Sequence, residues 1–197
     1  PAAAGEDDTF TISAIHRPPD PPAFLTESGT GRRPSPRVAA DLARQAAEAL
    51  QFAHEQGILH RDVKPSHLLV NDSGWRWVAD FGLARVPGDS DLTKSGDLVG
   101  TLRYMSPEQA MGERSVIDHR SDVYSLGVTL YELLTLRPAF ETDDPLARLR
   151  RIAEEDPCPP RRIDSSIPKD LETIVIKAMA KAPGDRYATA RDLADDL

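Results

Sequence analysis

The sequence lacks several features that define common protein classes. It has a single cysteine, Cys158, which excludes an internal disulfide and suits a reducing cytosol. No run reaches the roughly 18 consecutive apolar residues of a membrane span, and the first residues lack the cationic and then apolar pattern of a signal peptide. A basic excess is missing too, because the formal net charge is −8 at pH 7. This acidity argues against nucleic acid or an anionic membrane as the main partner.

These absences predict a cytoplasmic segment, or the cytosolic portion of a larger membrane-anchored protein. With 197 residues and 40% apolar content, the chain is long enough to bury one core. Residues 1–34 are rich in proline and cannot form one regular element, although 9–15 alternates apolar and polar residues as a half-buried strand does. Arginine clusters at 148–151 and 161–162 are interpreted as solvated faces. We divide the chain into segment 1–34 and a domain at 35–197.

From Ser35 onward the pattern is mainly helical. Ser35 and Pro36 give an N-cap followed by proline at the first helical position, and apolar residues, among them Val38, recur at helical spacing until Gly57. Two short apolar runs flank a turn-rich tetrapeptide at 71–74, which predicts a hairpin. The expected elements are helices from Ser35 to Gly57 and at 122–135, 145–154, 169–181 and 189–197, strands at 68–70 and 75–78, and a polar loop at 86–101.

One motif carries chemistry: His60-Arg61-Asp62-Val63-Lys64-Pro65-Ser66-His67 is followed 18 positions after Asp62 by Asp80-Phe81-Gly82. This pair resembles the catalytic loop and metal-binding turn of eukaryotic-type serine/threonine protein kinases. Gly100 to Glu108 resembles the substrate-docking end of their activation segment. The sequence from Ser106 to Ala110 is similar to that of bacterial members of the family, and the excess of arginine over lysine fits a bacterial source. The resemblance extends from about Ser35 to the end of the chain.

The family resemblance implies a fold and a set of active-site roles. The fold is the family's C-terminal lobe, mainly α within an α+β family, whose short β-hairpin carries the catalytic loop and the Asp-Phe-Gly turn. Asp62 would accept or orient the substrate hydroxyl proton, and Lys64 would neutralise the transferring phosphate. Asp80 would ligate Mg²⁺ that bridges the phosphates of ATP. Thr101 would align Asp62 and Lys64, and Leu69 would contact the adenine ring unless it is an ordinary core leucine.

The remaining residues of the resemblance are regulatory or structural. Thr93 and Ser95 are candidate phosphorylation sites whose phosphate could pair with Arg61 and order the loop. Asp122 would accept hydrogen bonds from the catalytic-loop backbone, and Glu108 would form a buried ion pair with Arg186. The residues given structural roles are His60, Phe81, Gly82, Glu108, Asp122 and Arg186.

His67 departs from the family pattern, which places asparagine there to help hold a second Mg²⁺. An imidazole offers nitrogen, which suits Mn²⁺ or Zn²⁺ better than Mg²⁺. Three interpretations follow from the sequence: a tolerated change with weaker binding of the second metal, an altered metal preference, or a catalytically inactive domain.

The phosphate clamp of the family's small lobe has no counterpart in the sequence. Nothing before Gly57 matches Gly-x-Gly-x-x-Gly, and the first lysine is Lys64. We interpret 9–15 as the last small-lobe strand and expect the chain to be truncated at both ends. The predicted function is a serine/threonine protein kinase domain that uses ATP, Mg²⁺ or Mn²⁺ and a protein substrate, and the alternative is a pseudokinase or docking module. For residues 1–197 alone we predict no detectable phosphotransfer; self-association is left open.

Overall fold

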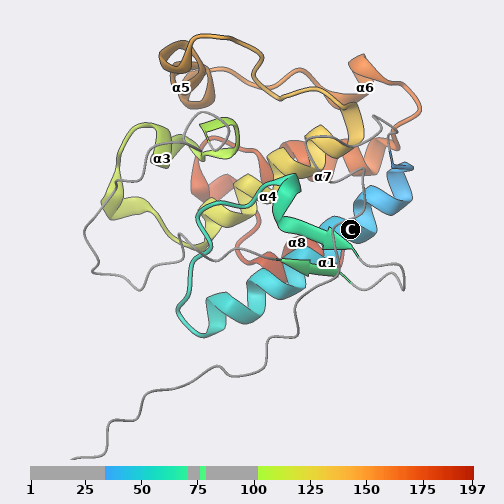
Figure 1. Ribbon diagram of the computed structural model, residues 1–197, viewed down its shortest axis with the longest axis horizontal. Helices are drawn as coiled ribbons and strands as arrows, with labels where there is room; N and C mark the ends of the chain where they lie inside the picture. The colour runs from blue at the N-terminus through green and yellow to red at the C-terminus, as the bar shows by residue number, and fades with distance from the viewer. Residues whose placement is uncertain (1–33, 71–75, 79–101) are drawn as a thin grey trace, which may run out of the picture.

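The computed structural model describes residues 34–70, 76–78 and 102–197, and helices dominate them (Figure 1). The mainly helical fold expected from the sequence is confirmed. The expected strand at 9–15 and polar loop at 86–101 lie outside the described residues. The elements are α1 (Pro36–Glu55), η1 (Pro65–His67), β1 (Leu68–Val70), β2 (Arg76–Val78), η3 (Leu102–Tyr104), α3 (Pro107–Ala110), η4 (Arg114–Val116), α4 (His119–Thr135), α5 (Pro145–Glu154), α6 (Pro160–Ile163), α7 (Lys169–Ala178), η5 (Pro183–Asp185) and α8 (Ala190–Asp196).

Helix α1 begins as its sequence predicts. The Ser35 hydroxyl accepts a hydrogen bond from the Val38 N–H at 3.3 Å, and Pro36 occupies the first turn, where a missing N–H costs nothing. Small and medium apolar residues fill the buried face, which packs on α4 and α8: Ala39, Leu42, Ala43, Ala46, Ala47, Leu50 and Ala53. Val38 is 40% exposed and lies outside this face, although it shares the helical apolar pattern.

Helix α4 is the centre of the core and is buried around most of its circumference. The Asp118 carboxylate caps its first turn by accepting from the Arg120 N–H at 2.8 Å. At Gly127 a Cβ atom would lie 2.9 Å from the Ala178 Cβ, so the absence of a side chain allows α7 to approach α4 closely. The helix begins at His119, earlier than the 122–135 expected, and it packs on α1, α6, α7, α8 and η3.

The remaining elements surround α4 in two groups (Figure 1). Helices α1, α7 and α8 pack on it or on one another, and β2 lies against α1. Strands β1 and β2 are antiparallel, with Leu68 opposite Val78 and Val70 opposite Arg76. On another side, α5 packs on α3 and η3. The stretch expected to be helical at 169–181 ends at Ala178, and α8 begins after an N-cap at Thr189.

Candidate active site

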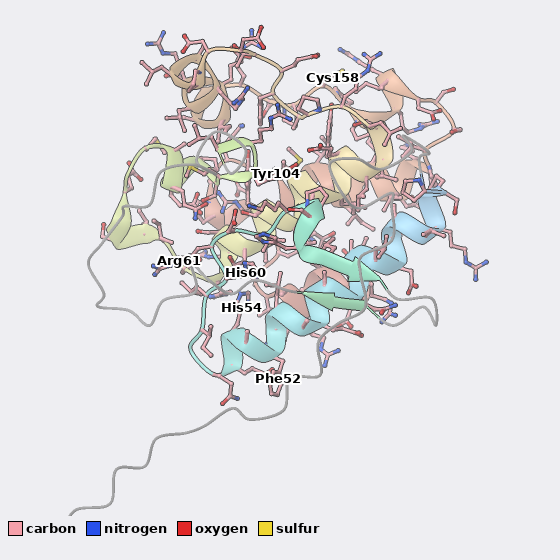
Figure 2. All side chains as sticks on the ribbon, viewed as in Figure 1. Phe52, His54, His60, Arg61, Tyr104 and Cys158 are labelled. Atoms are coloured by element: carbon pink, nitrogen blue, oxygen red, sulfur yellow. The ribbon has the colours of Figure 1, made fainter. Side chains whose placement is uncertain are left out.

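The 60–67 loop connects α1 to β1 and runs beside α4. Figure 2 shows His54, His60 and Arg61 close together there. Arg61 has φ of 64°, a left-handed conformation that a bulky residue rarely adopts. Such strain persists only where surrounding contacts fix the backbone.

Asp122 provides those contacts from the first turn of α4. Its Oδ2 accepts the His60 N–H at 2.9 Å and its Oδ1 accepts the Arg61 N–H at 2.7 Å. His54 Nε2 lies 2.8 Å from the same Oδ2. The carboxylate is almost fully buried, so these donors compensate for the water it has lost. The contact between Asp122 and the loop backbone is the one expected from the sequence, whereas no sequence signal pointed to His54.

Asp62 and Lys64 form an ion pair within the loop. Lys64 Nζ lies 3.0 Å from Asp62 Oδ2, and both side chains are largely buried. The Asp62 N–H donates to His60 Nδ1 at 3.3 Å, which further fixes the residue. Asp62 Oδ1 is buried without a hydrogen-bond partner among the described residues. One carboxylate oxygen is therefore oriented by lysine, and the other keeps its acceptor capacity.

His67 packs against the same aspartate. Its Nδ1 lies 2.8 Å from the Asp62 carbonyl oxygen and 3.7 Å from Asp62 Oδ2. Because a carbonyl oxygen only accepts, Nδ1 must carry the proton in this bond. The His67 ring is buried, with its centroid 5.9 Å from that of His60. His67 thus links the end of the loop to Asp62.

Two further residues that sequence reasoning missed reach the loop backbone. Gln109 Nε2 on α3 donates to the Arg61 carbonyl at 3.4 Å. Thr129 Oγ1 on α4 donates to the Ser125 carbonyl at 2.8 Å and also lies 3.4 Å from the Val63 carbonyl oxygen. Gln109 also accepts the Ser106 N–H at 2.9 Å in a capping box that begins α3. The loop is consequently fixed from both α3 and α4.

Glu108 and Arg186 form the buried ion pair expected from the sequence. Arg186 Nη2 lies 2.7 Å from Glu108 Oε2, and Nη1 lies 2.8 Å from Oε1, a bidentate geometry. Ser121 Oγ donates to Oε1 at 2.7 Å. Burial alone would raise the pKa of Glu108, yet the hydrogen bonds from Arg186 and Ser121 bring that pKa below its ordinary value. The pair ties α3 to the segment that precedes α8.

The structure brings together only part of the predicted site. Leu69 is described through its backbone, which pairs with Trp77 across the strands. Six residues with predicted roles lie outside the described residues: Asp80, Phe81, Gly82, Thr93, Ser95 and Thr101. The described residues contain no group of three or more His, Cys, Asp and Glu side chains able to hold a metal ion. Among the predicted metal ligands, the described part contributes His67, which fits a divalent cation through nitrogen.

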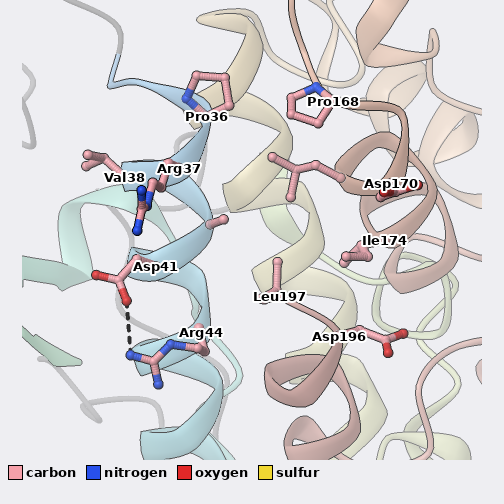
Figure 3. A pocket seen from close by; sticks show the side chains of 12 residues that line it. Pro36, Arg37, Val38, Asp41, Arg44, Pro168, Asp170, Ile174, Asp196 and Leu197 are labelled. Atoms are coloured by element: carbon pink, nitrogen blue, oxygen red, sulfur yellow. Dashed lines mark hydrogen bonds and ion pairs between the residues drawn. The ribbon is translucent and has the colours of Figure 1, made fainter.

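A groove of about 680 Å³ opens elsewhere on the surface (Figure 3). It lies between the start of α1, the start of α7 and the end of the chain, and none of the residues that line it comes from the 60–67 loop. Its walls carry both signs of charge, including the Asp41 and Arg44 pair at 3.0 Å. The groove is therefore separate from the candidate active site.

Comparison with known proteins identifies the class. The family model described as "Protein kinase domain" matches residues 25–196. This match covers most of the chain, so the chain belongs to the protein kinase domain family. The resemblance inferred from the motifs is confirmed, and membership implies ATP and a divalent metal ion as cofactors in general.

Individual relatives are bacterial serine/threonine kinases. The chain is 44% identical over 165 residues to serine/threonine-protein kinase PknB of Mycolicibacterium smegmatis, covering 83% of this chain. It is 42% identical over 165 residues to PknB of Mycobacterium tuberculosis and 41% identical over 179 residues to a probable PknB of Corynebacterium glutamicum. The chain spans 26%, 26% and 27% of the lengths of these three relatives. In the described part of the chain, no helix has the length and apolar character needed to cross a bilayer.

Proposed function

We propose that this chain forms the large lobe of a serine/threonine protein kinase, which transfers the γ-phosphate of ATP to serine or threonine hydroxyls of a protein substrate. The observation that carries the proposal is the environment of the two carboxylate oxygens of Asp62. Lysine orients one of its carboxylate oxygens at 3.0 Å, and the other is buried without a partner among the described residues. A positioned base needs an acceptor of this kind.

Asp62 and Lys64 divide the work at the reacting hydroxyl. Asp62 Oδ1 orients the hydroxyl and accepts its proton as the oxygen attacks the phosphorus. Lys64, already beside Oδ2, balances the negative charge of the transferring phosphate. Asp122 accepts hydrogen bonds from the backbone of His60 and Arg61. These contacts hold the loop that carries the reacting pair in place. Thr101 is proposed to align the pair, as the resemblance implies.

ATP and a divalent metal are the proposed cofactors. Asp80 and His67 would hold the metal, and Leu69 would contact the adenine ring. When bound, the metal would neutralise the nucleotide phosphates. The described hydrogen bond of His67 joins its Nδ1 to the Asp62 carbonyl oxygen, and an imidazole would bind a cation through nitrogen. Nitrogen favours Mn²⁺ over Mg²⁺, so we propose that Mg²⁺ binds the second position weakly and that Mn²⁺ can replace it.

Arg61 is proposed to respond to phosphorylation. Its Nε is buried without a partner among the described residues, although the guanidinium is always charged. A phosphate on Thr93 or Ser95 would supply the missing acceptor. The exposed, free thiol of Cys158 is compatible with a reducing compartment, where ATP is also available. We therefore place the domain in the cytosol, either free or as part of a membrane-anchored kinase.

A chimaeric kinase tests the proposed function. In it, the small lobe of the Mycolicibacterium smegmatis PknB precedes Leu25, where the family match begins, and supplies the phosphate clamp that the sequence lacks. We expect labelled phosphate to pass from ATP to serine or threonine in a general protein substrate. Residues 1–197 without the small lobe should give no product.

The phosphorylated amino acid separates the outcomes. The proposal is supported if the chimaera forms phosphoserine or phosphothreonine and its Asp62→Asn variant does not. A chimaera that folds and binds ATP but transfers no phosphate, even with Mn²⁺, would instead favour a pseudokinase. The same substitution in α7, Asp170→Asn, changes an exposed carboxylate and is the matched control.

A further inference from the structure

Arg148 is a buried cation on α5. Its side chain shares a helix face with Ile152, four residues later, and the residue is only 5% exposed. Arg150, two positions away on another face, is exposed. The arginine cluster at 148–151 was expected to be a solvated face, and Arg148 corrects that expectation, because the inward face of α5 includes it.

The guanidinium of Arg148 is incompletely paired. Its Nη2 donates to the Thr142 carbonyl. Its Nε and Nη1 are buried without a hydrogen-bond partner in the part of the chain that the structure describes. Arginine cannot lose its charge at any ordinary pH, and buried donors without acceptors are strongly unfavourable. Such a group requires an anionic partner that these contacts do not supply.

Three carboxylates near α5, those of Glu108, Glu132 and Asp144, are engaged elsewhere. Helix α5 packs on α3 and η3. Glu108 of α3 forms its bidentate pair with Arg186, and Glu132 of α4 accepts the hydroxyl of Tyr104 of η3 at 2.8 Å. Asp144 accepts the Leu146 N–H at 3.0 Å as the cap of α5. The acceptor for Arg148 is therefore sought outside this group of residues.

We propose that Arg148 is a specificity-determining residue that accepts an acidic side chain of the protein substrate. The inference rests on the proposed function, because α3 and η3 belong to the stretch whose sequence resembles the substrate-docking end of the activation segment. A carboxylate matches the chemistry of the guanidinium, which has donors only. Exposed Leu146 on α5 and Met111 after α3 provide apolar surface on the same elements for the rest of a peptide.

Paired peptides test this preference on residues 1–197. In each peptide a single glutamate occupies one position near a central serine, and its partner has glutamine there. Fluorescence anisotropy should show that glutamate at one position binds about tenfold more tightly than glutamine, as expected for hydrogen bonds to a charged group. Arg148→Met keeps a long side chain without donors, so it should bind both peptides equally. Arg150→Met on the exposed face should keep the tenfold preference.

Two results would overturn the inference: equal binding of glutamate and glutamine peptides by the unmodified chain, or a preference that survives in Arg148→Met. If the chimaeric kinase transfers phosphate while the peptides bind equally, the inference alone fails and the proposed function stands. Thermal unfolding provides a second readout. Removing unpaired buried donors should leave the Tm of Arg148→Met unchanged or raise it, whereas a lower Tm would mean that the guanidinium supports the fold instead.

Discussion

His67 Nδ1 lies 2.8 Å from the backbone carbonyl oxygen of Asp62. The proton of this bond is on Nδ1, because a carbonyl oxygen only accepts. An asparagine amide has a donor N–H and an acceptor oxygen, so it could make the same bond to the carbonyl and offer oxygen to a metal. His67 therefore keeps a contact that orders the loop while changing the donor atom from oxygen to nitrogen.

The first prediction concerns His67→Asn in the chimaeric kinase. Restoring an oxygen ligand should raise the rate supported by Mg²⁺ on the order of tenfold and lower the ratio of Mn²⁺ to Mg²⁺ rates. Steady-state assays over a range of metal concentrations measure both effects. His67→Phe, which keeps the ring but removes the donor, should be slower with either metal. An unchanged rate and metal dependence in His67→Asn would sink the account of a weakened metal site.

The second prediction concerns Asp122→Asn. The two carboxylate oxygens together face the N–H groups of His60 and Arg61, but an amide has only one acceptor oxygen. At least one buried donor is then opposed by the amide NH₂, so the free energy of unfolding should fall by about 1–3 kcal/mol. Urea denaturation measures this change. The exposed Asp170→Asn variant should have the same free energy of unfolding as the parent. An equal decrease in both variants would argue against a stabilising role for the hydrogen bonds of Asp122 to the loop.

The third prediction is a pH dependence caused by Glu108. Its pKa is lowered from the ordinary 4.5 in the folded protein, so its charge stabilises the fold above that value. This contribution is lost as the pH falls through the lowered pKa. Glu108→Gln should reduce the free energy of unfolding by about 3–5 kcal/mol at neutral pH, because the charge of Arg186 stays buried without its counter-ion.

Denaturation curves recorded from about pH 3 to pH 7 provide the measurement. The difference in free energy of unfolding between the parent and Glu108→Gln should become smaller in acid, because both proteins then have an uncharged side chain at this position. Glu113→Gln, an exposed change close to the end of α3, should leave the curves unaltered. If the loss of unfolding free energy in Glu108→Gln were the same at every pH, the carboxylate charge would not be what stabilises the fold.

The fourth prediction concerns the contact between α4 and α7. At Gly127 an added Cβ would lie 2.9 Å from the Ala178 Cβ and 3.1 Å from the Met179 Cγ. Gly127→Ala should therefore cost about 1–3 kcal/mol of unfolding free energy through overpacking. At Gly184 an added Cβ would have no heavy atom within 4 Å, so Gly184→Ala should be close to neutral. Similar Tm values for the two variants would be inconsistent with this close approach.

Sequence reasoning located the residues of the loop because their chemistry is written in consecutive letters. Asp62, Lys64 and His67 lie within six positions, and the η1 turn brings them together. The contact of Asp122 with the loop was also anticipated, because the resemblance to protein kinases implies it. The 60–67 loop could be found from local pattern alone.

Contacts that depend on how helices pack were harder to anticipate. Arg148 was interpreted as solvated because arginines clustered around it, yet its spacing from Ile152 placed it on the buried face of α5. Likewise, His54 and Gln109 belong to ordinary helices, and only tertiary packing brings them to Asp122 and to the Arg61 carbonyl. Charge and composition are properties of a whole segment, whereas the burial of a residue depends on which face of its helix packs against another element.

Asp62 is the proposed base for phosphoryl transfer, and a comparison of the chimaeric kinase with its Asp62→Asn variant tests this role directly. The amide keeps the shape of the side chain but cannot accept the proton of the hydroxyl. The account predicts a kcat lower by about 10²–10⁴-fold, with ATP binding unchanged. A variant that transfers phosphate at the parent rate would contradict it.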